Sequence, residues 1–240
     1  MKKPGSERQA DTPDGERIAK VIARAGMCSR RDAEKMIEAG RVTLDGKVLT
    51  SPAINVTPGQ RITVDGHPIP KAMRTRAFRY HKPRGLVTTA RDPQGRPTVF
   101  DALPKELPRV ISIGRLDINS EGLLLLTNDG DLARRLELPL TGWTRRYRVR
   151  LNGTVTDAAL AQLGKGMTVD GIRYDKVKAT LDRKQGDNAW LTMALKEGKN
   201  REIRKLCEHF GWRVNRLIRV AYGPFQLGEL PVALAQVVDL

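Results

Sequence analysis

Asp117 lies in the segment GRLDINSEG, two residues after Arg115 and between two runs of strand-like residues. A loop carboxylate of this kind is usually a cap or turn former, so a chemical role requires partners. Candidate partners are Tyr147 in RRYRVRL and two arginines, Arg201 and Arg204, in KNREIRKL. A tyrosine on an alternating strand is ordinarily a half-buried packing residue. Arginines at the start of a helix are often plain surface charge, but they can also bind phosphate or hold a carboxylate.

Common cofactor and metal motifs are absent from the sequence. None of the patterns GxGxxG, GxxxxGK[ST], GxSxG and HExxH occurs in the 240 residues. The three histidines, His67, His81 and His209, have no obvious nucleophile beside them. The two cysteines, Cys28 and Cys207, are far apart and form no CxxC pair, which excludes a disulfide framework or a zinc ribbon. We therefore expect no metal and no cofactor, and an enzyme of this sequence would work with ordinary side chains.

The charge of the chain favours a polyanion as its partner. Lys and Arg number 43 against 27 Asp and Glu, which gives a net charge of +16. Residues 1–74 hold 14 basic and 9 acidic side chains (+5), and residues 75–240 hold 29 and 18 (+11). A well-solvated surface explains many charges but not such an excess of one sign, so nucleic acid is the expected partner.

The first part of the chain predicts two helices followed by short strands. Apolar residues recur at helical spacing from Glu16 up to Gly26, and a second helix is predicted between Ser29, a good N-cap, and Gly40. The dipeptide Asp45-Gly46 between alternating apolar residues predicts a hairpin, and QRITVDG repeats the strand pattern. We predict a disordered tail over residues 1–15, an RNA-binding domain over 16–66 and a linker over 67–77.

The second part, residues 78–240, predicts a larger α+β domain. Helix-like runs cover residues 131–137, 157–164 and 200–210. Strand-like runs are Phe78 to Tyr80, Val110 to Ile113, Leu123 to Thr127, Tyr147 to Leu151, Val177 to Leu181, Trp190 to Leu195 and Leu217 to Val220. Several links between these runs are too short for a crossover helix, so the sheet is predicted to be mixed and mostly antiparallel.

The segment AKVIARAGMCSRRDAEKMIEAGRVTLDGKVL closely resembles the alpha-L RNA-binding module known from a small-subunit ribosomal protein and from several RNA-modifying enzymes. The resemblance covers Glu16 to about Gly66. It implies docking on structured RNA, led by the shape of the RNA. The implied RNA contacts are Ser29, Arg30, Arg31, Lys35, Arg41 and Lys47.

From about Phe78 to Leu240 the chain resembles pseudouridine synthases of the RsuA/RluB type. Six segments fit this family in order: YHKPRGLVTT, DPQGRPTVFDALP, GRLDINSEGLLLLTNDGDLARRL, RRYRVRLNG, EGKNREIRKL and NRLIRVAYGPFQLGELP. The segments RPTVFD and GKNREIRKL are more similar to the RluB branch, which acts on large-subunit (23S) ribosomal RNA. The resemblance implies the pseudouridine synthase fold and the isomerisation of a uridine to pseudouridine in ribosomal RNA.

The same resemblance implies roles for individual residues. Asp117 matches the catalytic carboxylate, and Tyr147 matches the ring that stacks on the target base. Arg204 matches the basic residue that pairs with the aspartate, and Ile203 the aliphatic residue against the base. Arg115 is a candidate to fill the stack that the base leaves.

The sequence departs from more distant pseudouridine synthases just before Ile203. Where they have His-Gln, this chain has Arg201 and Glu202, which leaves these two residues without an assigned role. The chemistry itself breaks the N1–C1′ bond and joins C5 to C1′, which a carboxylate can assist by attack at C1′ or through a glycal intermediate.

Two other functions fit part of the sequence. A non-catalytic ribosome-assembly factor would use the same basic surfaces, and a methyltransferase fused to the alpha-L module would need a glycine-rich nucleotide loop.

The N-terminus has no apolar core of a secretory signal, and no apolar run approaches the roughly 18 residues of a membrane span. We therefore expect a cytoplasmic monomer without membrane contact, acting on ribosomal RNA or a pre-ribosomal particle.

Overall fold

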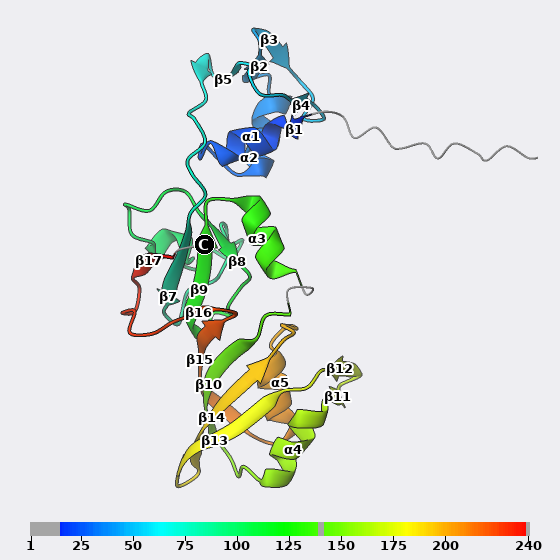
Figure 1. The fold of residues 1–240 in the computed structure, drawn as a ribbon, viewed down its shortest axis with the longest axis vertical. Helices are drawn as coiled ribbons and strands as arrows, with labels where there is room; N and C mark the ends of the chain where they lie inside the picture. The colour runs from blue at the N-terminus through cyan, green and yellow to red at the C-terminus, as the bar shows by residue number, and fades with distance from the viewer. Residues whose placement is uncertain (1–14, 139–141, 239–240) are drawn as a thin grey trace, which may run out of the picture. The chain divides into compact units, whose positions relative to one another are not determined.

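The computed structural model describes residues 15–138 and 142–238 of the chain (Figure 1). The predicted tail over residues 1–15 lies, apart from Gly15, outside the described residues. The chain divides into two compact units between Arg74 and Thr75. Among the described residues, no helix is long and apolar enough to cross a membrane.

The first unit contains two helices and short strands. Its elements are β1 (Glu16–Arg17), α1 (Ile18–Arg24), α2 (Arg30–Glu38), β2 (Val42–Leu44), β3 (Lys47–Leu49), β4 (Asn55–Val56), β5 (Ile62–Val64) and β6 (His67–Pro68). Ser29 caps α2, because its hydroxyl accepts a hydrogen bond from the main-chain N–H of Asp32 at 3.1 Å. Asp45 and Gly46 both have positive φ, 49° and 83°, as the predicted hairpin turn requires. The strands form a sheet in the order β3-β2-β5-β6, and β1 pairs with β4.

The segment between the two units is shorter than residues 67–77. His67 and Pro68 pair with β5 and so belong to the sheet of the first unit. At the other end, Thr75 Oγ1 donates a hydrogen bond to Asp129 at 2.7 Å, and Arg76 N donates to Asn128 Oδ1 at 2.7 Å. Residues 75–77 are therefore attached to the second unit. Ile69 N donates to the Ile62 carbonyl at 3.2 Å and its side chain packs on the core of the first unit, so residues 70–74 make the connection.

The second unit is built on one large sheet. Its first elements are β7 (Ala77–Lys82), the 3-10 helix η1 (Phe100–Ala102), β8 (Ile111–Ile113), β9 (Glu121–Thr127), α3 (Gly130–Glu137), β10 (Arg145–Asn152) and α4 (Asp157–Lys165). Then follow β11 (Met167–Val169), β12 (Ile172–Tyr174), β13 (Lys178–Gln185), β14 (Asn188–Leu195), α5 (Glu202–His209), β15 (Arg213–Tyr222), β16 (Phe225–Gln226) and β17 (Ala235–Val238).

The main sheet has nine strands and a single parallel pair among its described strands. Its order is β13-β14-β10-β15-β9-β7-β17, with β16 beside β15 and β8 beside β9. All pairs are antiparallel except β15 with β9, which meet at Ile218 and Glu121 and at Arg219 and Gly122. This short parallel contact joins the half of the sheet that carries α4 and α5 to the half that carries α3.

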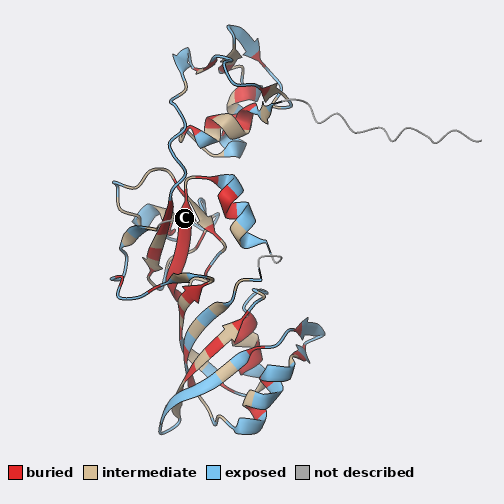
Figure 2. Ribbon diagram, in the orientation of Figure 1, coloured by how far each residue is buried: buried red, intermediate tan, exposed pale blue. Residues whose placement is uncertain are grey.

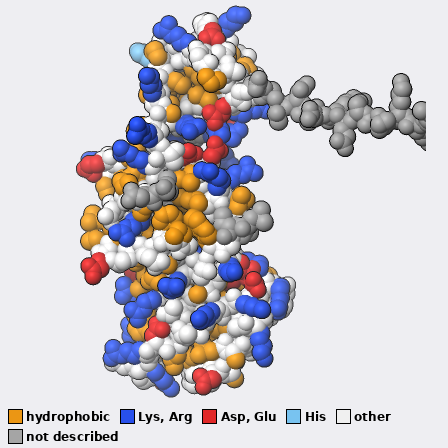
Figure 3. Space-filling view, viewed as in Figure 1, with side chains coloured by type: hydrophobic (Ala, Val, Ile, Leu, Met, Phe, Trp, Pro, Cys, Tyr) orange, Lys and Arg blue, Asp and Glu red, His pale blue; other side chains and the backbone are white. Residues whose placement is uncertain are grey.

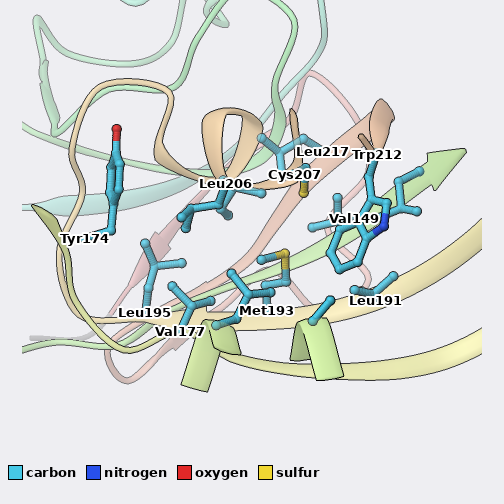
Figure 4. Close-up of a cluster of buried hydrophobic side chains, with 14 of the residues drawn as sticks. Val149, Tyr174, Val177, Leu191, Met193, Leu195, Leu206, Cys207, Trp212 and Leu217 are labelled. Atoms are coloured by element: carbon cyan, nitrogen blue, oxygen red, sulfur yellow. The ribbon is translucent and has the colours of Figure 1, made fainter. Parts of the chain in front are cut away.

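Buried side chains lie along the strands of both halves (Figure 2). Strand β9 is buried at every position, which confirms that Leu123 to Leu126 form an internal strand. One core cluster packs α4 and α5 against β10, β13, β14 and β15, and includes Cys207 and Trp212 (Figure 4). Burial raises the pKa of the Cys207 thiol to about 12, so Cys207 serves as core filling.

The predicted α+β architecture is confirmed, and so are the three helices and seven strands predicted in the second unit. The short strands β1, β4, β6, β11, β12, β16 and β17 were not predicted, because two to four residues carry little periodicity. Helix α5 begins at Glu202 rather than near Asn200. Arg201 is its N-cap and has a left-handed backbone, with φ of 52°.

Candidate active site

A cavity of about 830 Å³ opens on the second unit. Four of the residues singled out from the sequence line it together: Arg115, Asp117, Tyr147 and Ile203. They come from the β8–β9 loop, from β10 and from the first turn of α5. The fold thus collects residues that are up to 88 positions apart in the chain at one site.

The loop that carries Asp117 is held by main-chain contacts on both sides. Ser120 N donates to the carbonyl oxygen of Asp117 at 2.9 Å, which closes a turn. On the other side of the aspartate, the Thr88 hydroxyl donates to the Leu116 carbonyl at 2.8 Å. Gly85 N donates to the Ile118 carbonyl at 2.8 Å. These bonds fix the backbone of Asp117 while its side chain stays partly exposed.

Lys82 is hydrogen-bonded to the same loop. Its side chain is 0% exposed, and its Nζ donates to the carbonyl oxygens of Pro83 at 2.9 Å, Ser120 at 2.9 Å and Asp117 at 3.3 Å. These three bonds use all three donors of the ammonium group. Burial lowers the pKa of Lys82 to about 8, although the carboxylates of Asp117 and Glu121 act in the opposite direction.

Tyr147 has the half-buried position predicted for it. It lies on β10 opposite Arg219 of β15, packs against two core clusters, and lines the cavity. Ile203 is 4% exposed and belongs to the core beside α5. A ring and an aliphatic side chain that line one cavity suit a flat, uncharged ring such as a nucleobase.

Two arginines of the α5 region approach Asp117 in different ways. Arg201 Nη1 lies 3.9 Å from Asp117 Oδ2, which makes it an ion-pair partner. Arg204 instead donates from Nη2 to the carbonyl oxygen of Asn119 at 3.0 Å, and its Nε is buried without a partner. Burial lowers the pKa of Arg204, while the charge of Asp117 opposes that shift. Arg204 lines a smaller hollow of about 310 Å³ next to the main cavity.

Glu202 and Glu197 form a carboxyl pair at the base of the loop that carries Arg201. Glu202 is 3% exposed, and its Oε2 accepts a hydrogen bond from Lys199 N at 2.9 Å. Burial raises the pKa of Glu202 to about 8, with a further rise from Glu197. Burial alone would also raise the pKa of Glu197, but hydrogen bonds from Lys199 Nζ and Asp175 N lower it. Glu202 therefore holds the proton of the pair and Glu197 the charge.

Two further guanidinium groups face the cavity beside Tyr222. Arg219 is 3% exposed, and its Nε donates to the Leu123 carbonyl at 2.7 Å, while its Nη2 is buried without a partner. Arg145 donates to the Tyr222 hydroxyl at 3.2 Å. Both guanidiniums lie over the Tyr222 ring, at 4.9 Å for Arg145 and 5.2 Å for Arg219. These cations give the cavity a positive wall suited to a substrate phosphate or carbonyl group.

The residues predicted to bind RNA in the first unit lie at α2 and the β2–β3 hairpin. Arg31, Lys35 and Lys47 are exposed. The other three are engaged within the unit. Ser29 caps α2, Arg30 lies 3.6 Å from Glu34, and Arg41 donates two hydrogen bonds to Asp65, at 2.9 and 2.6 Å.

Lys82, Glu202 and Arg219 were missed from the sequence, although each carried a signal. In β7 and β15, period-two alternation puts Lys82 on the side of Phe78 and Tyr80, and Arg219 on the side of Leu217. Glu202 stands four residues before Leu206, so helical spacing turns it inward. A charged residue at an apolar position of a regular pattern is the signal that could have found all three.

Comparison with known proteins finds a family match in each unit. Residues 77–209 match the RNA pseudouridylate synthase family, and residues 16–69 match the S4 domain. An RNA pseudouridine synthase from Rickettsia bellii (strain RML369-C) is 52% identical over 215 residues, covering 90% of this chain and 93% of the relative. The ribosomal large subunit pseudouridine synthase B of Escherichia coli (strain K12) is 45% identical over 218 residues, covering 88% and 75%.

A solved structure shares the fold. A crystal structure of a pseudouridylate synthase superposes with a TM-score of 0.64 and 24% identity, over 93% of this chain and 96% of that one. With the family match over residues 77–209 and the relatives above, the chain belongs to the RNA pseudouridylate synthase family.

Proposed function

We propose that this protein isomerises one specific uridine of large-subunit (23S) ribosomal RNA to pseudouridine, with Asp117 as the catalytic carboxylate and no cofactor. The observation that carries the proposal is the placement of Asp117 in a cavity that Tyr147 and Ile203 also line, with Arg201 at 3.9 Å from its carboxylate. The name of the 45% identical relative from Escherichia coli supports the large ribosomal subunit as the source of the substrate.

Asp117 acts on the sugar of the target nucleotide. The N1–C1′ bond breaks as the carboxylate attacks C1′ or assists a glycal intermediate, and the detached uracil turns within the cavity. A new bond then joins C5 to C1′, the proton leaves C5, and N1 gains a proton. Product and substrate have the same atoms, so the step needs no oxidant or second substrate.

The other cavity residues hold the two reacting parts in place. Tyr147 stacks on the base and helps to remove the C5 proton, while Ile203 packs against the base. Arg201 and Arg204 orient Asp117, Arg201 by direct contact and Arg204 through the loop carbonyl of Asn119. Arg115, which is exposed at the cavity, takes the place of the base in the RNA stack, which offsets part of the few kcal/mol that unstacking costs.

The first unit supplies affinity for structured RNA. Arg31, Lys35 and Lys47 contact phosphates directly, and Ser29, Arg30 and Arg41 shape the surface on which they lie. The protein acts in the cytoplasm as a monomer on ribosomal RNA or a pre-ribosomal particle.

Release of tritium tests the function. Ribosomal RNA labelled with tritium at uridine C5 is incubated with the wild type, with Asp117→Asn, and with Asp157→Asn as a control. Asp157 is an exposed carboxylate in the first turn of α4, outside the cavity, so its replacement makes the same charge change. Wild type and Asp157→Asn should release tritium, and Asp117→Asn should not, while all three bind the RNA with similar affinity.

Strong residual release by Asp117→Asn would refute the role of this carboxylate. If the wild type binds both free RNA and ribosomal precursors yet releases no tritium from either, the non-catalytic assembly factor becomes the better account.

A further inference from the structure

In the half of the sheet that β10, β13, β14 and β15 form, one face is covered by cations, while α4 and α5 pack against the other face. Residues alternate between the two faces of a strand. On β10, Arg145, Tyr147, Val149 and Leu151 face the cavity and the core, so the residues between them face the other way. We call this opposite side the arginine face. Its cations are Arg146, Arg148, Arg150, Lys178, Arg183 and Arg216.

The strand register places these cations in rows across four strands. One row runs Arg183, Trp190, Arg150, Arg216 from β13 to β15. A second row begins with Lys178 on β13 and reaches Arg146 on β10 through Ala194 of β14. Cations two residues apart on β10 are separated by about 6.8 Å, and neighbouring strands by about 4.8 Å. The result is a flat array of positive side chains and not a single cluster.

Few carboxylates balance this array. Asp182 lies 3.8 Å from Arg148 Nε, and Glu121 lies 2.5 Å from Arg216 Nε, so two of the six cations have an ion-pair partner. No ion pair or hydrogen bond is found within the described part of the chain for the side chains of the other four. All six residues are exposed. In Figure 3, Lys and Arg side chains are spread over the part of the surface that β10, β13 and β14 occupy in Figure 1.

One contact on the arginine face opposes the stability of the isolated sheet. Arg150 and Arg216 are directly opposite each other on adjacent antiparallel strands, an arrangement that destabilises a sheet when the charges are alike. Arg148 lies over the ring of Trp190, with 4.9 Å from the guanidinium carbon to the ring centroid. This contact keeps a half-buried aromatic ring and a guanidinium plane together on an otherwise polar surface. Such a surface gains stability when a polyanion covers it.

We infer that the arginine face binds the phosphate backbone of an RNA segment other than the one in the cavity. The inference rests on the proposed function for the presence of RNA, but the face lies on the opposite side of β10 from Asp117 and Tyr147. An RNA segment bound there is therefore separate from the target nucleotide and belongs to another part of the same folded RNA.

RNA fits this face better than an acidic protein. The cations lie in a flat grid with regular spacing, which suits a repeating backbone charge, whereas a protein partner would require apolar anchors at the centre of the contact. Apart from Trp190, whose ring Arg148 covers, the residues between the cations are Thr180, Thr192, Ala194 and Ile218, which are small or only partly exposed. Arginine, which predominates over lysine here, also binds phosphate in a bidentate manner.

Salt-dependent binding tests this inference. The full chain with Arg146→Gln, Arg148→Gln and Arg150→Gln is compared with a control triple, Lys105→Gln, Arg134→Gln and Arg135→Gln, which removes the same charge from exposed sites away from the face. Binding to a large-subunit ribosomal RNA transcript is measured between about 50 and about 200 mM KCl. The face triple should bind at least about tenfold more weakly, and its slope of log affinity against log salt should be smaller by about 2 to 3.

Equal losses in the two triples would show that only net charge matters and would overturn the inference, as would unchanged RNA binding by the face triple. A variant with Arg→Lys at the same three positions keeps the charge and should keep the salt slope of the wild type. It therefore shows whether the face triple loses affinity through its missing charges or because substitution at these positions disturbs folding. The tritium release rate at saturating enzyme should be the same for the face triple and the wild type. If the wild type releases no tritium but the face triple still loses affinity, the proposed function fails and the inference about the face stands.

Discussion

Lys82 donates a hydrogen bond from Nζ to the main-chain carbonyl oxygen of Asp117, at a distance of 3.3 Å, from a side chain that is 0% exposed. The end of β7 is thereby joined to the backbone of the proposed catalytic residue. Because the bond goes to the main chain, Lys82 fixes the position of Asp117 while the carboxylate oxygens stay available to other partners. This relationship makes Lys82 a positioning residue.

Replacing Lys82 with Met should affect stability and turnover together. The change removes the Lys82 donor from the carbonyl oxygens of Pro83 and Ser120, and one of two donors from that of Asp117. We expect a loss of about 3 kcal/mol in the free energy of unfolding. Urea unfolding measures this loss. Tritium release at saturating RNA, measured at a temperature where the variant is folded, should be at least about tenfold slower.

The exposed Lys105 supplies the control, because Lys105→Met removes the same charge without a buried partner. Wild-type stability and turnover in Lys82→Met would contradict the positioning role.

Glu202 should make the stability of the protein depend on pH. Its pKa in the folded protein is about 8, above the ordinary value of 4.5 that it has when unfolded. Between these two values the folded state keeps a proton that the unfolded state releases, so stability falls as pH rises through this window. Above about pH 8 both states are ionised, and the contribution stays constant.

Thermal melting of the wild type and Glu202→Gln between pH 5 and pH 9 measures this effect. The glutamine variant cannot release the proton, so it should gain stability relative to the wild type as pH rises to about 8. Glu208→Gln, at an exposed position of the same helix, should show no such trend. A constant difference between the wild type and Glu202→Gln across this range would show that Glu202 does not retain its proton on folding.

The sequence predicted the features that depend on neighbouring residues. The cap at Ser29, the turn at Asp45 and Gly46, and the buried strand over Leu123 to Leu126 are each written in a few consecutive residues, and all three are found. The resemblance to a known family added the gathering of Asp117, Tyr147 and Ile203, which line one cavity.

The remaining features depend on contacts between distant segments. Lys82 bonds to carbonyl groups 35 and 38 residues further along the chain, and Arg201 reaches Asp117 across 84 residues. No local pattern encodes such distances, so the sequence left Arg201 without a role. The parallel contact of β9 with β15 is of the same kind, because its paired residues are 97 positions apart and their register follows from the packing of both halves.

That parallel contact leads to a prediction at Gly122. Its φ is +103°, and a Cβ atom at this position would lie 2.3 Å from the carbonyl oxygen and 2.8 Å from the nitrogen of Arg219. Backbone atoms of a packed strand cannot move aside cheaply. Gly122→Ala should therefore cost more than about 3 kcal/mol in the free energy of unfolding, measured by urea.

Gly186 offers the matched control for this substitution. It also has a positive φ, +57°, but a Cβ there would meet nothing within 4 Å. Gly186→Ala should cost only the backbone strain, about 1 to 2 kcal/mol. Equal costs at the two glycines would show that the close approach of β9 and β15 is not what Gly122 provides.

Replacing Arg201 should lower activity with little change in stability. Its guanidinium is the ion-pair partner of Asp117, and its backbone has a φ of 52°, a conformation that costs any residue except glycine. Arg201→Gly removes the side chain and relieves the backbone strain at once, so stability should change by less than about 1 kcal/mol. Turnover should fall at least about tenfold, because the carboxylate loses its nearest cation.

Arg204→Gln should differ, since it also removes the hydrogen bond to the Asn119 carbonyl, and should lower both stability and turnover. Tritium release and urea unfolding measured on the two variants side by side decide the matter. If Arg201→Gly keeps wild-type turnover while Arg204→Gln loses it, Arg204 alone serves Asp117, and the contact at 3.9 Å is a feature of the RNA-free protein.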